Sequence, residues 1–465
     1  MNNLAASKDN LAALRANIDS LVAEGRLDTV GVAGGDFNGI LRGKYLPAAK
    51  FLAEAESPMA LGDMVFVLDP SEGVVVDGPD EGWWPVSDRG FKEMRCLSIP
   101  ESFRLVPWRD RTALILADYE FNDGTPVDAA PRRVLQRVVE RARSLGFEPM
   151  TGYELEFFVF RETPSSAAAK GYRDLEPAAS RRQAWSMLQD AQDEHLTRHL
   201  QRGLEEFGVP IETWLVEGAH GQFELNVPYA DTMCSADRAL LHRFAVKELA
   251  EREGLLATFM ARPPGTAYGS SMHLHHSLCR EDGTNAFSDP GAPDALAGLA
   301  RHFIAGQLAL QRELSCLFAP NVNSYKRLLP GLSSGPIATW GFENWSTAVR
   351  VISSTPKATR IEFRTAGADA NPYLAMAASL AAGLYGIEQQ LEPPPATEGL
   401  AEEVDAPRVP RSLEEAMAAL DGSAVARQLF GDHFVDVFLA TRRGELDAFQ
   451  NTVTDWEAER YLRAL

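Results

Sequence analysis

The spacing of hydrophobic and polar residues changes near residue 126. Ahead of that point, short apolar runs broken by Gly, Pro and Asp predict strands over residues 29–33, 39–45, 64–68, 73–76 and 112–118. A helix is expected before them, because apolar residues from Leu11 to Val22 recur at helical spacing and Gly25 follows as a stop signal. Residues 1–125 are therefore predicted to form a small β-rich domain.

Beyond residue 126, longer amphipathic stretches alternate with strand-like segments. An apolar stripe from Val134 to Leu145 predicts a helix that begins near Pro131 and ends at Gly146. Further helices are expected over residues 178–207, 236–253 and 371–389, and from Leu413 onward. We therefore expect residues 126–465 to form a second, α+β domain, and a length of 465 residues agrees with two domains.

The strand predicted over residues 152–158 carries acid on one face only. Glu154 and Glu156 share a face because side chains alternate along a strand, while Leu155 and Phe157 occupy the other face. Two adjacent carboxylates repel each other unless a cation joins them. Taken alone, the segment fits a solvated strand face as well as it fits a cation site.

Three later segments repeat this division into a polar and an apolar face. The polar groups are Glu217, Gln222 and Glu224 in residues 217–224, His273, His275 and Ser277 in residues 269–278, and Arg360, Glu362 and Arg364 in residues 360–364. A lone His-x-His pair is more often structural than metal-binding, yet the four segments together hold more carboxylates than a protein buries without metal. Carboxylate oxygens with an imidazole suit Mg²⁺ or Mn²⁺ better than Zn²⁺.

Arginines at positions 327, 350, 360 and 364 supply charge of the opposite sign. Metal-binding acids beside arginines are typical of phosphoryl transfer. The chain has no P-loop and no kinase-type Gly-rich sequence, so ATP would need a different binding site.

The composition limits the classes of molecule that the protein is expected to bind. A formal charge of −20 argues against binding to nucleic acid or to an anionic membrane surface. The four cysteines lack metal-binding spacing, which favours reduced thiols in a cytoplasmic protein. We see no signal-peptide layout and no apolar run long enough to span a membrane.

Ordered motifs along nearly the whole chain resemble those of the glutamine synthetase superfamily. They are Asn38-Gly39 with Arg42-Gly43-Lys44, GYELEFFVF, EGAHGQFE, GSSMHLHHSL, APNVNSYKRLLPG, RIEFR and NPYLAMAASLAAGLYGI. The tail from Val453 to Tyr461 is similar to the γ-glutamylpolyamine synthetase branch. The resemblance implies an N-terminal β-grasp domain, a larger catalytic domain with a curved antiparallel sheet and surrounding helices, and a homo-oligomer of stacked six-subunit rings.

The resemblance also implies an ATP-dependent ligase that joins the γ-carboxylate of glutamate to an amine through a γ-glutamyl phosphate. Two or more Mg²⁺ or Mn²⁺ ions would be held by Glu154, Glu156, Glu217, Glu224, His273 and Glu362. Nucleotide contacts are implied for Glu212, His275, Ser277, Arg350 and Lys357, and phosphate contacts for Arg350 and Arg360. Glutamate would be held by Gly269, Arg327 and Arg364.

Departures from the family pattern concern the second substrate. Ser333 stands where ammonium-using members have a Glu that guards the ammonium site, and their acidic first-domain loop is missing, with Asp63 the nearest acid. A small cation needs fixed negative charge around it, so we expect an organic amine instead and assign Ser333 to its site.

Two more positions differ near the substrates. Trp345 replaces an arginine that touches the transferring phosphate, and it either lines an apolar amine pocket with Trp340 or Leu332 or simply packs. Tyr268 replaces a small residue beside the glutamate site, which leaves the identity of the acid open. The alternatives are an authentic glutamine synthetase with a rebuilt ammonium site and a catalytically weak sensor or scaffold.

Overall fold

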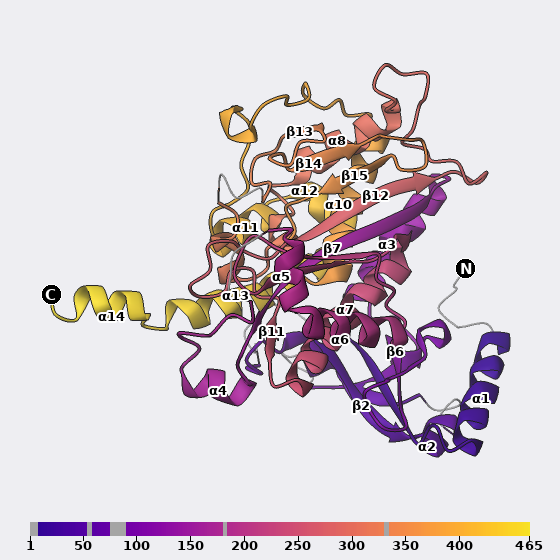
Figure 1. Cartoon of the computed structure of the whole chain (residues 1–465). Coiled ribbons are helices and arrows are strands. Elements are labelled where there is room, and N and C mark those ends of the chain that lie inside the picture. Colours follow the sequence, from indigo (N-terminus) through magenta and orange to yellow (C-terminus); the bar gives the residue numbers. More distant parts are fainter. Residues whose placement is uncertain (1–7, 54–57, 75–89, 180–183, 330–333) are drawn as a thin grey trace.

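Two β-sheets form the frame of the molecule (Figure 1). The computed structural model describes residues 8–53, 58–74, 90–179, 184–329 and 334–465. The first sheet has the order β2-β1-β6-β4-β3, with β5 beside β6. Its strands are β1 (Thr29–Gly35), β2 (Leu41–Pro47), β3 (Ala60–Gly62), β4 (Glu93–Ser98), β5 (Arg104–Leu105) and β6 (Thr112–Phe121). Strands β1 and β6 run parallel, and helices α1 (Lys8–Ala23) and α2 (Ala48–Ala53) lie beside this sheet in Figure 1.

The second sheet carries the polar segments and has the order β13-β14-β15-β12-β7-β9-β8. Its main strands are β7 (Glu148–Phe160), β8 (Thr213–Val216), β9 (Gln222–Asn226), β12 (Met272–Cys279), β13 (Trp340–Phe342), β14 (Val349–Ile352) and β15 (Arg360–Phe363). Short strands β10 (Ala230–Asp231) and β11 (Leu256–Thr258) also pair with β7. Every pairing in this sheet is antiparallel except that of β13 with β14.

Long helices pack against the apolar face of this sheet. They are α3 (Pro131–Ser144), α7 (Thr232–Arg252), α8 (Gly298–Leu310) and α10 (Pro372–Glu388). Helix α10 begins where the Asn371 side chain accepts the backbone N–H groups of Tyr373 and Leu374, and it is buried over most of its length. A Cβ added at Gly386 would lie 2.0 Å from the His302 carbonyl oxygen, so glycine permits the close crossing of α8 and α10.

The remaining helices complete the fold. They are α4 (Pro164–Ala169), α5 (Met187–Gln192), α6 (Glu194–Glu206), α9 (Ser315–Phe318), α11 (Leu413–Asp421), α12 (Ala424–Phe430), α13 (Asp432–Gln450) and α14 (Asp455–Tyr461). Figure 1 shows α14 projecting from the body of the molecule. No helix in the described part of the chain is long and apolar enough to cross a membrane.

Most elements predicted from the sequence are present, and two are corrected. Residues 64–68 were expected as a strand but lie mainly in a 3₁₀ helix, Asp63–Val67, because Val65, Phe66 and Val67 are all buried and the Asp63 carboxylate accepts the Lys92 N–H at 2.9 Å. The helical stretch over 178–207 is shorter, since α5 begins only at Met187 and residues 180–183 lie outside the described part. Of the strand expected over 73–76, Val74 forms an isolated bridge with Leu68, and residues 75 and 76 are outside the described part.

The division into domains at residue 125 stays a prediction. Strand β6 ends at Phe121 and α3 begins at Pro131, so the two sheets lie on either side of this boundary in sequence. Buried hydrophobic side chains nevertheless form one continuous cluster through both sheets. Buried Arg442 adds a polar link, since it donates hydrogen bonds to Asn38 Oδ1 at 2.8 Å and to the Pro320 carbonyl at 3.2 Å.

Candidate active site

Strand register brings the predicted acids and histidines together on one face of the second sheet. Glu154 lies opposite His273 across β7 and β12, and Glu362 lies opposite His275 across β15 and β12. Glu156 lies opposite Glu224 across β7 and β9. Directly opposed side chains on antiparallel strands are neighbours, so four distant sequence segments form one polar cluster.

The tightest group consists of Glu154, His275 and Glu362, whose ligand atoms all lie within 4.8 Å of one another. Glu154 Oε1 is 3.0 Å from His275 Nε2, and Glu154 Oε2 is 3.0 Å from His273 Nδ1. His273 Nδ1 is also 3.6 Å from Glu362 Oε1. The structure therefore places His275, predicted as a nucleotide contact, as close to these acids as the predicted ligand His273.

A second group of acids consists of Glu156, Glu217 and Glu224. Burial, and then the charge of Glu217, raise the pKa of Glu156 to about 7. Burial is also the main cause that raises the pKa of Glu217 and, well above its ordinary value, that of Glu224, with nearby carboxylates adding to both. Gln222 donates to Glu156 Oε2 at 2.9 Å, but no arginine forms an ion pair with these three acids among the described residues.

These observations fit divalent metal ions. Buried carboxylates with raised pKa values are uncompensated negative charges, which a cation would stabilise in their ionised form. His273 Nδ1 lies 3.0 Å from Glu154 and 3.6 Å from Glu362, so this nitrogen is placed to share an ion with both carboxylates. Oxygen donors with imidazole favour Mg²⁺ or Mn²⁺ over softer ions.

Arginines border the cluster on the side of β14 and β15. Arg364 forms an ion pair with Glu362, and Arg350 donates to Glu362 Oε2 at 2.9 Å and pairs with Glu343. Burial raises the pKa of Glu362, but the charges of Arg364 and the two histidines outweigh it, so the net pKa is lowered. Glu362 is thus held ionised by its neighbours.

Arg327 and Gly269 lie next to each other near the cluster. Arg327 is buried, donates to Ser271 Oγ at 3.1 Å and to the Thr365 carbonyl, and burial lowers its pKa to about 10. A Cβ at position 269 would lie 2.2 Å from the Ala261 carbonyl oxygen and 2.6 Å from Arg327 Cγ, so only glycine fits. Tyr268 packs beside the small apolar cluster of Phe158, Phe160 and Ala219.

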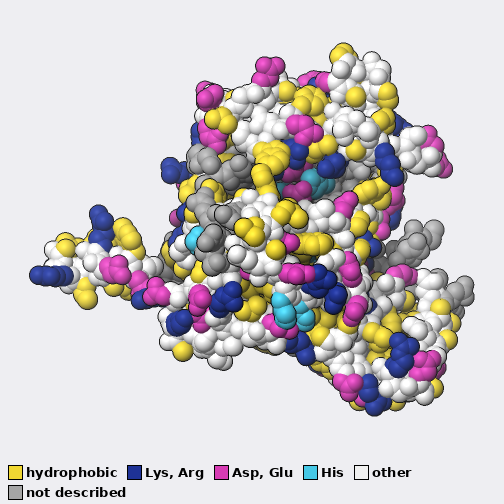
Figure 2. Space-filling model, in the orientation of Figure 1, with side chains coloured by type: hydrophobic (Ala, Val, Ile, Leu, Met, Phe, Trp, Pro, Cys, Tyr) yellow, Lys and Arg dark blue, Asp and Glu magenta, His cyan; other side chains and the backbone are white. Residues whose placement is uncertain are grey.

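A cavity of about 1050 Å³ opens beside the cluster. Its lining includes the predicted nucleotide contacts Glu212, His275, Ser277 and Lys357, together with Arg360. Arg360 Nε donates to His275 Nδ1 at 3.3 Å, which joins the cavity to the acidic cluster. Arg350 is not among the described lining residues and instead faces the acids. On the face drawn in Figure 2, histidine and charged side chains gather in a hollow of the upper half.

The surroundings of Trp345 differ from those expected. Trp340 is buried and donates its indole N–H to the Pro394 carbonyl at 2.7 Å, so it is not the partner of Trp345. Trp185 takes that place, with ring centroids 5.4 Å apart. Asp63 is buried in the first sheet's 3₁₀ helix, and Ser333 and Leu332 lie outside the described residues.

Sequence reasoning missed Trp185 and Glu343. Trp185 belongs to a charged stretch that was expected to be helical, and its only signal is an aromatic residue among polar ones. Glu343 follows β13 and has a left-handed backbone, φ 48°, which no local motif announces.

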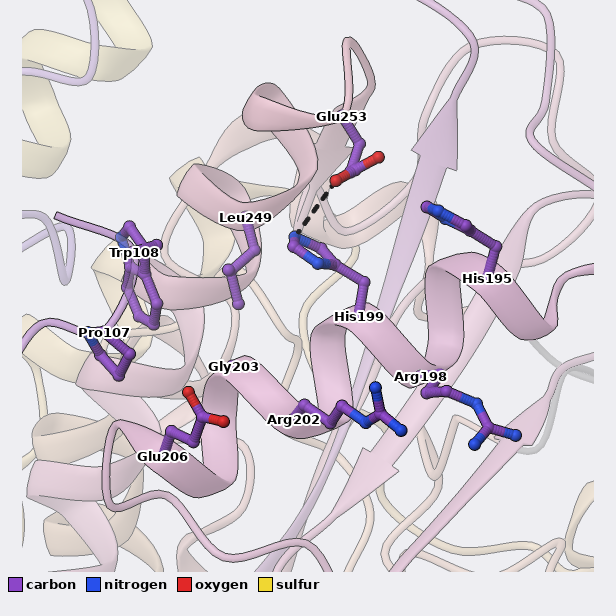
Figure 3. A pocket seen from close by; sticks show the side chains of 10 residues that line it. All are labelled: Pro107, Trp108, His195, Arg198, His199, Arg202, Gly203, Glu206, Leu249 and Glu253. Carbon is purple, nitrogen blue, oxygen red and sulfur yellow. Dashed lines mark ion pairs between the residues drawn. The ribbon is translucent and has the colours of Figure 1, made fainter.

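A second cavity, of about 340 Å³, lies between α6, α7 and the loop that holds Pro107 and Trp108 (Figure 3). His199 Nε2 and Glu253 Oε1 are 3.6 Å apart across its rim, and Arg198 and Arg202 point along α6 in the same view. None of the predicted site residues lines this cavity, so it is separate from the acidic cluster.

The fold and the ordered motifs define the protein family to which the chain belongs. The chain belongs to the glutamine synthetase family, because residues 128–461 match the family described as "Glutamine synthetase, catalytic domain". The resemblance seen in the sequence and the predicted fold class are thereby confirmed.

Particular relatives are ligases for organic amines. The chain is 38% identical over 443 residues to a γ-glutamylethanolamide synthetase of Streptomyces coelicolor, covering 95% of this chain and 94% of the relative. It is 34% identical over 450 residues to a glutamate–isopropylamine ligase of a Pseudomonas species, covering 96% and 97%. A solved structure described as "Apo GmaS without ligand" has a TM-score of 0.82 and 28% identity, covering 96% of this chain and 99% of that one.

Proposed function

We propose that this protein is an ATP-dependent carbon–nitrogen ligase that joins the γ-carboxylate of glutamate to an organic amine. The observation that carries the proposal is the acidic and imidazole cluster, bordered by arginines and opening into a cavity of about 1050 Å³. Two relatives with near-complete coverage are named for γ-glutamylethanolamide and for isopropylamine, which favours an organic amine over ammonium.

In this proposal two or more Mg²⁺ or Mn²⁺ ions are held by the acids and His273. The ligands are Glu156, Glu217 and Glu224 for one ion and Glu154, His273 and Glu362 for another. Bound ions would neutralise the negative charge of the phosphate oxygens and of the acids themselves. ATP occupies the cavity, where Lys357 and Arg360 contact its phosphates and Glu212 and Ser277 help to position it.

Glutamate is held between Arg327 and Arg364, with the Gly269 backbone beside it. A γ-carboxylate oxygen attacks the γ-phosphorus of ATP and ADP leaves, which gives γ-glutamyl phosphate. The amine nitrogen then attacks the acyl carbon, the bond from carbon to the phosphate oxygen breaks, and the nitrogen loses a proton. Arg350 and Arg360 stabilise the negative charge on the phosphate as it transfers and leaves.

Phosphate release from ATP tests the proposal. Purified protein with Mg²⁺, glutamate and an organic amine is expected to release phosphate and to form a γ-glutamyl amide detectable by mass spectrometry. Glu156→Ala should abolish release, while the exposed-surface control Glu205→Gln on α6 should not change it. Ammonium as the best nucleophile would support an authentic glutamine synthetase, and binding of amine without phosphate release would support a sensor.

We also propose that the protein is cytoplasmic and assembles as stacked six-subunit rings. Family resemblance supports the assembly, and the reduced state expected of the four cysteines supports the location. Light scattering would test the assembly, and a monomer at working concentration would contradict it.

A further inference from the structure

Two half-exposed tryptophans form an aromatic pair beside the acidic cluster. The ring centroids of Trp185 and Trp345 lie 5.4 Å apart with the planes at 85°, an edge-to-face arrangement. Their exposed fractions, 58% and 47%, are large for tryptophan. Trp185 precedes α5 and Trp345 lies between β13 and β14, so distant parts of the chain build this surface.

Trp185 contacts a carboxylate of the cluster directly, and Trp345 is linked to another through Arg350. The Trp185 side chain donates a hydrogen bond to Glu217, and the Trp185 backbone N–H bonds to the Val216 carbonyl at 2.9 Å. The Arg350 guanidinium lies 5.4 Å from the Trp345 ring centroid, and Arg350 in turn donates to Glu362. The pair therefore bridges the two proposed metal groups.

Trp185 adopts a left-handed backbone conformation, with φ 59°. This conformation is costly for a bulky residue and persists only where surrounding contacts impose it. An indole held out toward solvent at such a cost has little packing benefit. The strain is thus an independent indication that the position of this ring matters for binding.

The pair lies outside the lining of the nucleotide cavity. The described residues that line that cavity include Glu154, His275 and Arg360 but neither tryptophan. The phosphate of an acyl phosphate points toward the nucleotide that supplied it. The amine must therefore reach the acyl carbon from elsewhere, and the tryptophan pair borders that approach.

We propose that Trp185 and Trp345 are the specificity-determining wall of the amine site, and that the substrate is a primary monoamine with an apolar body. This inference rests on the proposed ligase function. The indoles offer apolar area to an alkyl or aryl group. A second ammonium group is disfavoured, because the Arg350 guanidinium already occupies the cation position over the Trp345 ring.

A matched pair of amines separates the alternatives. Butylamine and 1,4-diaminobutane have the same carbon chain, and only the diamine carries a second charge. We expect kcat/KM for butylamine to exceed that for the diamine at least tenfold. Along methylamine, ethylamine and propylamine, kcat/KM should rise about fourfold per methylene, since burying one methylene contributes about 0.8 kcal/mol.

Variants assign this preference to the tryptophans. Trp345→Ala should lower the ratio of kcat/KM for butylamine to that for ammonium at least tenfold, with KM for ATP within about threefold of the unmodified protein. Trp345→Phe, which keeps a ring, should restore most of that ratio, and it also serves if the alanine variant fails to fold. Trp185→Phe keeps the ring and removes the N–H donor to Glu217, and Trp456→Phe on α14 is the matched distant control.

The outcomes are distinct. A diamine that matches or exceeds butylamine overturns the assignment of a monoamine substrate. An unchanged butylamine-to-ammonium ratio in Trp345→Ala overturns the tryptophan assignment, and both results leave the ligase function intact. Absence of phosphate release with every amine overturns the proposed function and the assignment together.

Discussion

Replacing Glu156 by Gln should stabilise the metal-free protein at pH 8 while weakening its binding of metal. Glu156 is buried and faces Glu217 and Glu224, and its pKa is raised from 4.5 to about 7. The ionised carboxylate is therefore disfavoured by folding. Glutamine resembles the protonated form in shape and carries no charge, so the variant avoids this cost at every pH.

The size of the stability difference follows from the raised pKa of Glu156. An acid with a raised pKa contributes stability that is fully present below its unfolded value of 4.5 and is lost as the pH rises through about 7. When Glu156 is fully ionised, the loss of folding free energy is about 3 kcal/mol. Spread over a chain of 465 residues, this amounts to a difference in Tm of about 3 °C between the variant and the unmodified protein at pH 8. At pH 4.5 the difference should vanish.

Comparing the two proteins at each pH removes from the result the titrating groups that lie away from Glu156. Burial lowers the pKa of His242 and of His276 to about 3, which makes both proteins more stable as the pH rises toward 6.5. These contributions are equal in both proteins and cancel in the difference. The pKa of Glu154 is lowered, so its titration changes stability only below pH 4.5, outside the range from pH 4.5 to 8.

The assay is thermal unfolding from pH 4.5 to 8 in EDTA, followed by titration with Mn²⁺ in a calorimeter. In the unmodified protein, the apparent Mn²⁺ affinity should fall at least tenfold for each pH unit below 7, because the metal must displace the proton on Glu156 and also protons on Glu217 and Glu224, whose pKa values are raised too. Glu156→Gln should bind more weakly and with less dependence on pH. A variant that is less stable than the unmodified protein at pH 8 without metal would refute the reasoning.

Three further variants test other parts of the site and fold. Arg364→Ala should raise KM for glutamate at least tenfold and KM for ATP less than threefold, measured by phosphate release; equal changes would give the arginine a different role. Lys357→Ala should mainly raise KM for ATP, and an unchanged value would argue against nucleotide in the 1050 Å³ cavity. Gly386→Ala should lower Tm and the yield of folded protein, because its Cβ would lie 2.0 Å from the His302 carbonyl oxygen; unchanged melting would mean that α8 and α10 separate at little cost.

Alternation along single strands was enough to predict which side chains share a face. Glu154 and Glu156, and likewise His273 and His275, were assigned correctly because a strand has a period of two whatever its neighbours are. Which strands lie side by side is not contained in that period. The shared chemistry of the four polar segments suggested that Glu362 and Glu217 belong to one site, and family resemblance was needed to divide the acids between two ions.

The aromatic pair could not be predicted from local pattern. Trp185 is held by the Val216 carbonyl and by Glu217, contacts that cross some thirty residues of sequence and interrupt the expected helix. Similarly, the Met64–Leu68 run becomes helical through a bond from Lys92 to Asp63. Short apolar runs are ambiguous between strand and helix, and distant partners decide them.

The residue-for-residue matching of β7, β12 and β15 limits where this chain tolerates changes in length. Inserting or deleting one residue within any of these strands would turn its acids and histidines toward the packed helices and bring apolar side chains to the catalytic face. Trp185 and Trp345 lie outside the strands, in connecting segments where a change of length does not alter the register of the sheet. Libraries that randomise those connections can therefore search for new amine substrates while the phosphoryl-transfer machinery stays intact.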